Sequence, residues 1–365
     1  MDLRLSEDQQ LLKDTLERFV RNEYDFDARR KLAESDEGFS REIWKSHAEM
    51  GLLGMPFAEE DGGIGGGPVE VMIVMEQFGR ALALEPYLGT VILAGRAIAE
   101  AGSPAQKEAL LGSIIAGEAL WAFAHAEPGA RYNLSHVETR AESGKLTGQK
   151  AVVHGAVAAD KIVVSARSDV GISLYVVAGD AEGLSLRPYR TIDGLRAAEV
   201  TLDNVPGKLL GEDGGAMPVI ESVIDRATAA VCAEAVGAMD MLRETTLEYL
   251  QTRKQFGVPI GKFQVLQHRS VEMMGSCEEA RSLTLMATLS LDQDAAARAR
   301  AVSAAKVGIG TRGRHVGQEA IQMHGGMGMT DELKVGHYFK RVSMIDAMFG
   351  NTDHHLDRFA VASVS

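Results

Sequence analysis

The segment "KLTGQKAVVHGAVAADKIVVSARSDVGISLYVVAG", residues 145–179, decides the fold class of this chain. It holds three short runs rich in Val, Ile and Thr, which are divided by Gly, Asp and Ser and not by helical stretches. Such runs are typical of strands in a small β-barrel or sandwich, because a parallel βαβ sheet needs a helical crossover between successive strands. Similar runs on both sides, "VETRAES", "LSLRPYR" and "AAEVTLDNV", complete a predicted middle β-domain over residues 118–218.

The stretches before and after this β-domain are predicted to be helical. In "LSEDQQLLKDTLERFVRNE" (residues 5–23) the apolar residues recur at helical spacing, and Ser6 with Gln9 three residues later predicts a capping box. The C-terminal helices are expected to be long, and the first carries apolar residues on more than one face, as in a bundle or an interface. The sequence therefore predicts an α+β chain with helical domains at 1–117 and 219–365.

Composition and charge exclude several classes of function. The chain has 365 residues with 38 Lys and Arg against 51 Asp and Glu, and no basic block, so neither nucleic acid nor an anionic membrane surface is an expected partner. No apolar run reaches 18 residues and the N-terminus does not read as a signal peptide, so we expect a cytoplasmic protein without a membrane span. Cys232 and Cys277 are expected to be packed thiols, and their spacing predicts no metal site.

A glycine-rich motif, "QMHGGMGM" at 322–329, follows a strongly helical stretch. Glycines end helices, but they also permit positive φ and a close approach of main-chain amides to an anion, so the motif is either a helix cap or a ligand contact. Three further motifs accompany it: "AEPGA" at 126–130, "LTGQKAVV" at 146–153 and "RKQFGVPIGKFQ" at 253–264.

In their order and spacing these motifs resemble the acyl-CoA dehydrogenase family, over essentially the whole chain. The resemblance implies an N-terminal helical domain, a middle antiparallel β-barrel or sandwich domain and a C-terminal four-helix bundle. It also implies FAD, bound between the β-domain and the bundle, with the adenine end reaching a neighbouring subunit. The implied reaction transfers the Cα proton of an acyl-CoA thioester to a carboxylate base and the Cβ hydride to the flavin. The family's proton transfer needs a positioned base in a water-poor cavity, and the enolate-like charge needs hydrogen-bond donors.

The resemblance places cofactor contacts in the C-terminal domain at Arg253, Gln255, Phe256, Gln322, Gly325 and Gly326. Gln322 and the two glycines match a Q-x-x-G-G pattern that contacts the diphosphate and adenine side of FAD on the partner subunit. Arg253 and Phe256 match a position on the diphosphate and the flavin edge, where arginine can pair bidentately with phosphate. Gln255 stands where the family often has a hydroxyl residue.

The β-domain motifs keep the shape of the family's flavin loop but lack side chains that donate hydrogen bonds to the cofactor in the family. The family usually reads "TEPGAGSD", and this chain reads "AEPGARYN", so Ala126 replaces the threonine that binds the flavin. Phe123 is expected to keep its place in the loop, and Arg131 either serves a phosphate or lies at the surface. Val152 and His154 replace the family's Trp and Thr in the following motif, and His154 is either a flavin contact or a structural residue.

The position of the family's usual catalytic base also holds no carboxylate in this chain. Many family members have Glu in a Tyr-Glu-Gly-Thr motif, where this chain reads "FGNT" with Gly350 at the base position and Thr352 at the threonine that we assign to the cofactor site. A minority place the Glu on the first bundle helix, and Asp225 lies within two residues of that position. Asp225 is therefore the candidate base, or else a charge favoured near a helix N-terminus, and Asp353 is the alternative.

These losses resemble one chain of heteromeric family members, most of all the small subunit of pimeloyl-CoA dehydrogenase-type enzymes. We accordingly expect FAD-dependent fatty-acid metabolism on an acyl-CoA substrate, with an electron-transferring flavoprotein as the electron acceptor. The expected assembly is a homo-oligomer or an α2β2 heterotetramer with a paralogous large subunit. Two alternatives stay open: a non-catalytic partner chain, and a flavin monooxygenase or oxidase on the same fold.

Overall fold

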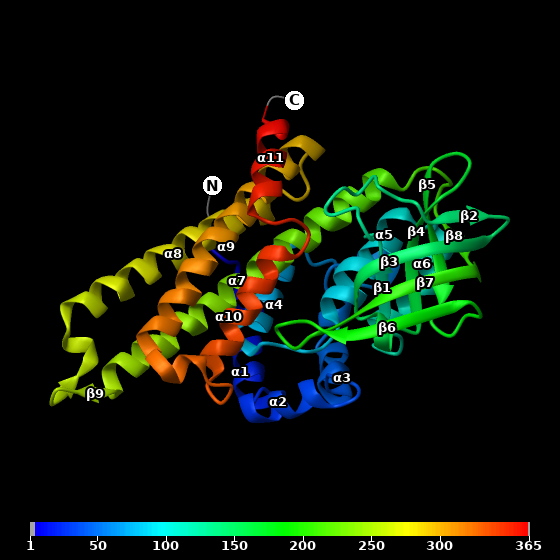
Figure 1. Ribbon diagram of the computed structural model, residues 1–365. Coiled ribbons are helices and arrows are strands. Elements are labelled where there is room, and N and C mark those ends of the chain that lie inside the picture. The colour runs from blue at the N-terminus through cyan, green and yellow to red at the C-terminus, as the bar shows by residue number, and fades with distance from the viewer. Residues whose placement is uncertain (1–3, 364–365) are drawn as a thin grey trace. The chain divides into compact units, whose positions relative to one another are not determined.

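The computed structural model describes residues 4–363, which form two compact units (Figure 1). The sheet unit comprises Arg29–Gly67 and Leu84–Ala227. The bundle unit comprises Pro68–Ala83 together with the described parts of Met1–Ala28 and Thr228–Ser365. Both units are built from segments far apart in the sequence, so they group the chain differently from the three predicted domains, whose limits stay a prediction.

The sheet unit holds one eight-stranded sheet, in the spatial order β6-β7-β3-β2-β4-β5-β8 with β1 beside β4. Its strands are β1 (Trp121–Ala124), β2 (Arg140–Glu142), β3 (Lys145–His154), β4 (Lys161–Arg167), β5 (Ile172–Ala178), β6 (Leu184–Arg190), β7 (Arg196–Pro206) and β8 (Lys208–Leu210). The apolar residues that alternate along these strands form one buried cluster, which includes Leu146, Ile162, Val164 and Val200. The predicted β-domain is therefore confirmed.

Two strand pairs depart from the antiparallel arrangement that the sequence predicted. β1 pairs with β4 in parallel over four residues, and β2 meets β4 in parallel at Arg140 and Arg167. The short strand β1 reads only as "WAFA", too little for a periodicity to reveal it. A parallel pair needs a long connection between its strands, and the chain from β1 to β4 runs through β2 and β3.

Short helices complete the sheet unit. They are α3 (Arg41–Glu49), η1 (Leu52–Gly54), η2 (Glu59–Asp61), the π-helix η3 (Leu88–Gly95), α5 (Arg96–Ala101), α6 (Pro104–Ile115) and η4 (Ala156–Ala158). The π-helix is buried over all but its first residue, and its Thr90 hydroxyl donates to the carbonyl oxygen of Trp121 at 3.0 Å. Thr90 Oγ1 also accepts from the Trp121 amide at 3.1 Å, so this helix and β1 are tied together.

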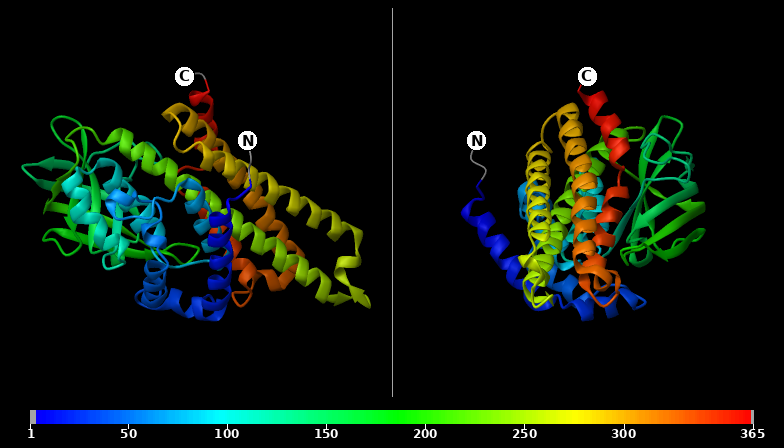
Figure 2. Two further views of the ribbon diagram at one scale, coloured as in Figure 1. Left: turned by 180° about the vertical axis from the view of Figure 1, so that it is seen from behind. Right: turned by 60° about the vertical axis from the view of Figure 1, so that its left-hand side comes forward.

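The bundle unit consists mainly of long helices. They are α1 (Glu7–Glu23), α4 (Pro68–Ala81), α8 (Gln264–Leu289), α9 (Ala295–His324), η6 (Gly325–Met329), α10 (Lys334–Ala347) and α11 (Thr352–Ala362), with the hairpin β9 (Lys254–Gln255) and β10 (Val258–Pro259) and the turn η5 (Ile260–Lys262). The helices α2 (Phe26–Glu34) and α7 (Met217–Thr252) each contain one of the boundaries between the units. The helix α9 packs against α8, α10 and α11, and Figure 2 shows the yellow α8 and the orange α9 side by side. The predicted helical C-terminal domain and the capping box of Ser6 with Gln9 on α1 are confirmed.

The crossing of α4 and α7 depends on two glycines. A Cβ atom on Gly79 would lie 1.9 Å from the carbonyl oxygen of Glu234, and one on Gly237 would lie 1.9 Å from that of Glu76. Only hydrogen fits there, so the two backbones approach more closely than any side chain allows. Beside this crossing, Arg281 pairs with Glu76 at 2.8 Å and with Asp240 at 2.5 Å.

Across residues 4–363, no helix combines the length and the apolar character that crossing a bilayer requires.

We predict that Gly237→Ala destabilises the protein, because the added methyl group overlaps the Glu76 carbonyl oxygen. Overpacking of this kind costs about 1–3 kcal/mol, which urea unfolding followed by circular dichroism would measure. Gly275→Ala on α8 is the matched control, since its Cβ would meet nothing within 4 Å, and it should be neutral or stabilising by up to about 1 kcal/mol. Equal urea midpoints for Gly237→Ala and the wild type would contradict the close-packed crossing.

Candidate functional site

The loop after β1 is held by a buried carboxylate. Glu127 Oε1 accepts from Lys150 Nζ at 2.7 Å and from the Thr139 amide at 3.0 Å, and Oε2 accepts from the Glu138 amide at 2.6 Å. Lys150 is completely buried and also donates to Ser165 Oγ at 2.9 Å. One side chain thus joins both ends of the 127–139 loop to the central strands β3 and β4.

Burial alone would raise the pKa of the Glu127 carboxyl, but the Lys150 ammonium and the hydrogen bonds from Lys150, Thr139 and Glu138 lower it below its ordinary value. Glu127 is therefore ionised at neutral pH. A buried pair of this kind adds little stability beyond an apolar pair, but losing one partner leaves a charge without compensation. The pair consequently positions the loop in one conformation.

The predicted flavin contacts of the sheet unit lie close to this loop. The Ala126 carbonyl oxygen accepts from the Ala151 amide at 2.9 Å, which brings the loop against β3 three residues before His154. His154 is half-buried at the end of β3, whereas the Phe123 side chain is only 2% exposed. The structure thus brings Ala126 and the strand of His154 together, while Phe123 is packed inside the sheet unit.

Sequence reasoning missed one imidazole in this region. His125 precedes Ala126, and its ring lies 5.1 Å from the Phe123 ring, centroid to centroid. Burial, together with the nearby charges of Lys150 and His154, lowers the pKa of His125 to about 3, so this histidine is neutral. Its place directly before the "AEPGA" motif was the only signal in the sequence.

A group of possible metal ligands also includes Glu127. The ligand atoms of Glu127, His136 and Glu138 all lie within 4.8 Å of one another. Both Glu127 oxygens, however, already accept hydrogen bonds from Lys150 and two amides. A cation at this position would also face the positive charge of the Lys150 ammonium, which lies 2.7 Å from Glu127 Oε1, so the group supports no metal assignment.

In the bundle unit the "QMHGGMGM" motif is both a helix cap and an open backbone. The helix α9 ends at His324, and Gly325 follows as its C-cap with a φ of +60°. A Cβ atom on Gly325 or Gly326 would meet nothing within 4 Å, and Gln322 is exposed one turn earlier. The Gly325 amide already donates to the Gln322 carbonyl oxygen, but no side chain blocks the approach of an anion to this exposed backbone, so the segment fits a diphosphate contact.

The predicted contacts Arg253, Gln255 and Phe256 lie on the β9–β10 hairpin of the bundle unit. Gln255 pairs with Val258, which leaves Phe256 and Gly257 as a two-residue loop with φ angles of +53° and +84°. Positive φ at both central positions is the type I′ turn that matches the twist of a hairpin. Phe256 is 90% exposed at the tip, and Arg253 is exposed at its base.

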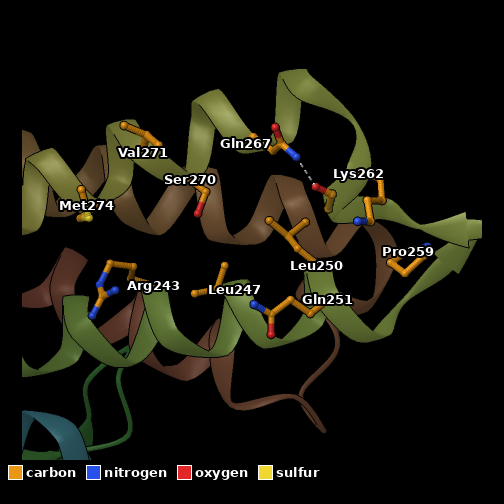
Figure 3. A pocket seen from close by; sticks show the side chains of 11 residues that line it. Arg243, Leu247, Leu250, Gln251, Pro259, Lys262, Gln267, Ser270, Val271 and Met274 are labelled. Atoms are coloured by element: carbon orange, nitrogen blue, oxygen red, sulfur yellow. Dashed lines mark hydrogen bonds between the residues drawn. The ribbon is translucent and has the colours of Figure 1, made fainter.

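Beside this hairpin, a cavity of about 450 Å³ lies between α7 and α8 (Figure 3). Leu247 and Leu250 of α7 and Met274 of α8 line its walls, and Arg243 and Lys262 add two cations. Gln267 Nε2 donates to the Gly261 carbonyl oxygen at 2.9 Å and closes the end next to the hairpin. The cavity combines an apolar lining with positive charge.

The two candidate bases lie in different units. Asp225 is 1% exposed on α7 within the sheet unit, and its neighbour Arg226 pairs with Glu100 at 3.1 Å. Asp353 is exposed in the first turn of α11 in the bundle unit. Beside it, Thr352 Oγ1 donates to Asp346 Oδ1 at 3.1 Å, so this predicted cofactor residue already has an internal partner.

The turn at Gly350 leaves no room for a side chain. Gly350 has a φ of +123°, and a Cβ atom there would lie 2.5 Å from His354 Cδ2 and 2.6 Å from His355 Nε2. Lys306, buried on α9, donates from Nζ to the carbonyl oxygens of Gly350 at 2.5 Å and Asp346 at 2.9 Å. The position that resembles the family's usual base is therefore shaped for glycine and rigidly held.

Comparisons with known proteins agree over nearly the whole chain. Models of the N-terminal, middle and C-terminal domains of acyl-CoA dehydrogenases match residues 6–118, 122–205 and 214–363. A 3-(aryl)acrylate reductase of Clostridium sporogenes is 30% identical over 86% of this chain and 88% of its own. The probable acyl-CoA dehydrogenase YngJ of Bacillus subtilis is 27% identical over 99% of both chains. A solved structure of the Tcur3481-Tcur3483 steroid ACAD, in a variant form, has a TM-score of 0.90 at 27% identity and covers 98% of both chains.

We predict that Lys150→Met strongly destabilises the protein, because the Glu127 carboxylate would stay buried without its ammonium partner. Breaking one side of a buried pair costs about 3–5 kcal/mol, measurable by urea unfolding. Lys145→Met, an exposed lysine on the same strand, is the matched control and should unfold like the wild type. If the two variants were equally stable, the buried pair would not hold the loop.

Proposed function

Because this chain belongs to the acyl-CoA dehydrogenase family, we propose that it takes part in the α,β-dehydrogenation of an acyl-CoA thioester as one subunit of an oligomer in which its own base site is degenerate. The family membership makes it an FAD-dependent oxidoreductase. The turn at Gly350 is the observation that carries the proposal of a degenerate base, since φ and the two imidazoles both exclude a glutamate there.

FAD is the cofactor, and the residues of the bundle unit fit its diphosphate. The exposed glycine backbone at Gly325 and Gly326 has no side chain to block the approach of an anion, and the exposed Arg253 can donate to a phosphate oxygen. We propose that Gln322, Gln255 and Phe256 complete this group. When bound, FAD supplies the acceptor for the β-hydride of the substrate.

The flavin end of the cofactor has fewer donors in this chain than in the family pattern. Ala126 offers only its main chain, and its carbonyl oxygen is already engaged by Ala151. We propose that His154 supplies a ring nitrogen where the family has a hydroxyl. The neutral His125 adds polarity without charge to the same part of the sheet unit.

Removal of the α-proton is the step for which this chain is least equipped. Asp225 is the proposed acceptor if the chain acts alone, but it is buried and one methylene shorter than glutamate. A general base must reach the proton directly or through one water. A partner chain with an intact base would remove this difficulty. The name of the similar Tcur3481-Tcur3483 structure itself joins two proteins.

The degenerate base position also favours a second function, a non-catalytic chain that completes the FAD site of a paralogous large subunit. We propose a heteromer over a homo-oligomer for the same reason. The pimeloyl-CoA type, the electron-transferring flavoprotein as acceptor and the cytoplasmic location stay predictions that follow from the sequence.

Purification of the chain with and without a longer paralogue tests the proposed function. We expect FAD to be bound and acyl-CoA to reduce an artificial electron acceptor in at least the co-purified complex. Reduction of the acceptor by the isolated chain would favour an independent enzyme, and a colourless, inactive chain that gains both properties with the paralogue would favour the non-catalytic role. A complex that had no flavin and no activity would refute the dehydrogenase assignment.

We predict that, if the isolated chain reduces its flavin with acyl-CoA, Asp225→Asn slows this reduction by about 10²–10⁴-fold in stopped-flow bleaching, as for removal of a general base. The variant keeps the shape of the side chain and should retain FAD. Glu221→Gln, an exposed carboxylate near the start of the same helix, is the control and should leave the rate unchanged. A rate for Asp225→Asn close to that of the control would exclude Asp225 and direct attention to Asp353 or to a partner chain.

We predict that Arg253→Ala weakens FAD binding more than Arg131→Ala does. Arg253 lies at the base of a hairpin whose motif matches the family, whereas Arg131 lies in a loop whose motif has changed. Loss of a charge-assisted phosphate contact costs about 1.5–3 kcal/mol, or roughly 10- to 150-fold in affinity. Flavin fluorescence titration of both apoproteins measures this, and equal dissociation constants would speak against a phosphate contact at Arg253.

A further inference from the structure

The bundle unit contains a second cavity, and none of the residues that line it is a proposed cofactor contact. It has a volume of about 170 Å³ and lies among α1, α4, α7 and α8. Most of its wall is apolar, with Met72 and Ile73 from α4, Val236 from α7 and Leu285 from α8. An apolar cavity of about 150 Å³ is large enough to hold a benzene molecule.

Two buried polar side chains that line this cavity each have an oxygen atom without a hydrogen-bond partner among the described residues. They are Gln77 on α4, 1% exposed, and Thr284 on α8, 2% exposed. The atoms concerned are Gln77 Oε1 and Thr284 Oγ1. An unsatisfied buried polar atom costs about 1–3 kcal/mol, so two of them in one cavity indicate that something else satisfies them.

The charges at the cavity limit what can bind. Glu76 and Arg281 line it, but they pair with each other at 2.8 Å, and Arg281 also pairs with Asp240 at 2.5 Å. Lys13 of α1 is the remaining lining cation, and it is half-buried, so its flexible side chain can direct the ammonium to water. The lining therefore presents no buried charge that a ligand of opposite charge would neutralise.

We propose that this cavity binds one neutral molecule of about the size of benzene that carries a single hydroxyl or carboxamide group. The apolar wall takes the body of the ligand. A glutamine amide and a threonine hydroxyl each donate and accept, so a group with both capacities satisfies both side chains at once. A phenol is the simplest molecule of this class.

The test uses full-length protein with its flavin bound and phenol as the probe. Titration calorimetry should show saturable binding with a dissociation constant on the order of 1 mM, the affinity of about −4 kcal/mol that so small a ligand can reach. Excess acyl-CoA should not displace the phenol, since the cavity lining includes neither a proposed FAD contact nor Asp225, the proposed acceptor of the substrate's proton. Absence of saturable binding, or displacement by acyl-CoA, would overturn the proposal.

Isosteric variants show whether the two polar atoms are responsible. Thr284→Val and Gln77→Met should each weaken phenol by about 3- to 10-fold, the loss expected for one hydrogen bond, and should leave benzene binding unchanged. Thr288→Val is the matched control, because this buried threonine on α8 already donates to the Thr284 carbonyl oxygen at 2.9 Å and does not line the cavity. Equal phenol affinities in Thr284→Val and Thr288→Val would refute the assigned contact.

A cavity-filling variant and a crystal structure with bound ligand complete the test. Val236→Phe should place a ring in the cavity and abolish binding of both phenol and benzene, with a circular dichroism spectrum like that of the wild type. If this variant does not fold, a crystal soaked with 4-bromophenol decides instead, because the anomalous signal of bromine locates the ligand. A peak among α1, α4, α7 and α8 supports the proposal, and a peak only elsewhere, or ordered water alone in the cavity, overturns it.

Discussion

The salt bridge between Glu127 and Lys150 is the interaction on which the sheet unit depends most. It lies inside the strand core, where an ionised carboxylate is tolerated only because an ammonium and two amides surround it. Those amides belong to Glu138 and Thr139, so the same bonds close a loop and attach it to β3. The Ala151 amide then reaches Ala126, and the backbone that the family uses for the flavin is held in place even though its threonine is gone.

The bundle unit is organised around positions where no side chain fits. Gly79 and Gly237 let α4 and α7 cross at backbone distance, and Gly350 allows the turn before α11. At the crossing the consequence is structural, because it brings Glu76 and Asp240 within reach of Arg281. At the turn the consequence is chemical. A glycine with φ of +123°, packed on two imidazoles, cannot be exchanged for the glutamate that proton abstraction would need.

The two halves of the proposed cofactor site have therefore changed to different extents. The diphosphate side relies on open glycine backbone and an exposed arginine, and both are present. The flavin and base side relies on particular side chains, and here alanine, histidine and glycine stand in for hydroxyl and carboxylate groups. The proposed site thus keeps the groups expected to bind the diphosphate and lacks the carboxylate expected at the base position, which is the basis for the proposed role beside a more complete partner.

The sequence alone determined the element types, because periodicity and capping are local: the capping box at Ser6 and the β-runs of residues 145–179 needed no tertiary information. It also predicted candidate cofactor positions, through motifs whose residues are close in the chain, and their contact with FAD stays a prediction. Only the tertiary structure decided that β1 pairs in parallel with β4, that Lys150 neutralises Glu127, and that His125 is neutral. Those properties arise from residues distant in the chain, whose burial and charge take effect only after folding. The same holds for the cavity at Gln77 and Thr284, which are 207 positions apart by their numbers and share one wall only because α4 and α8 meet.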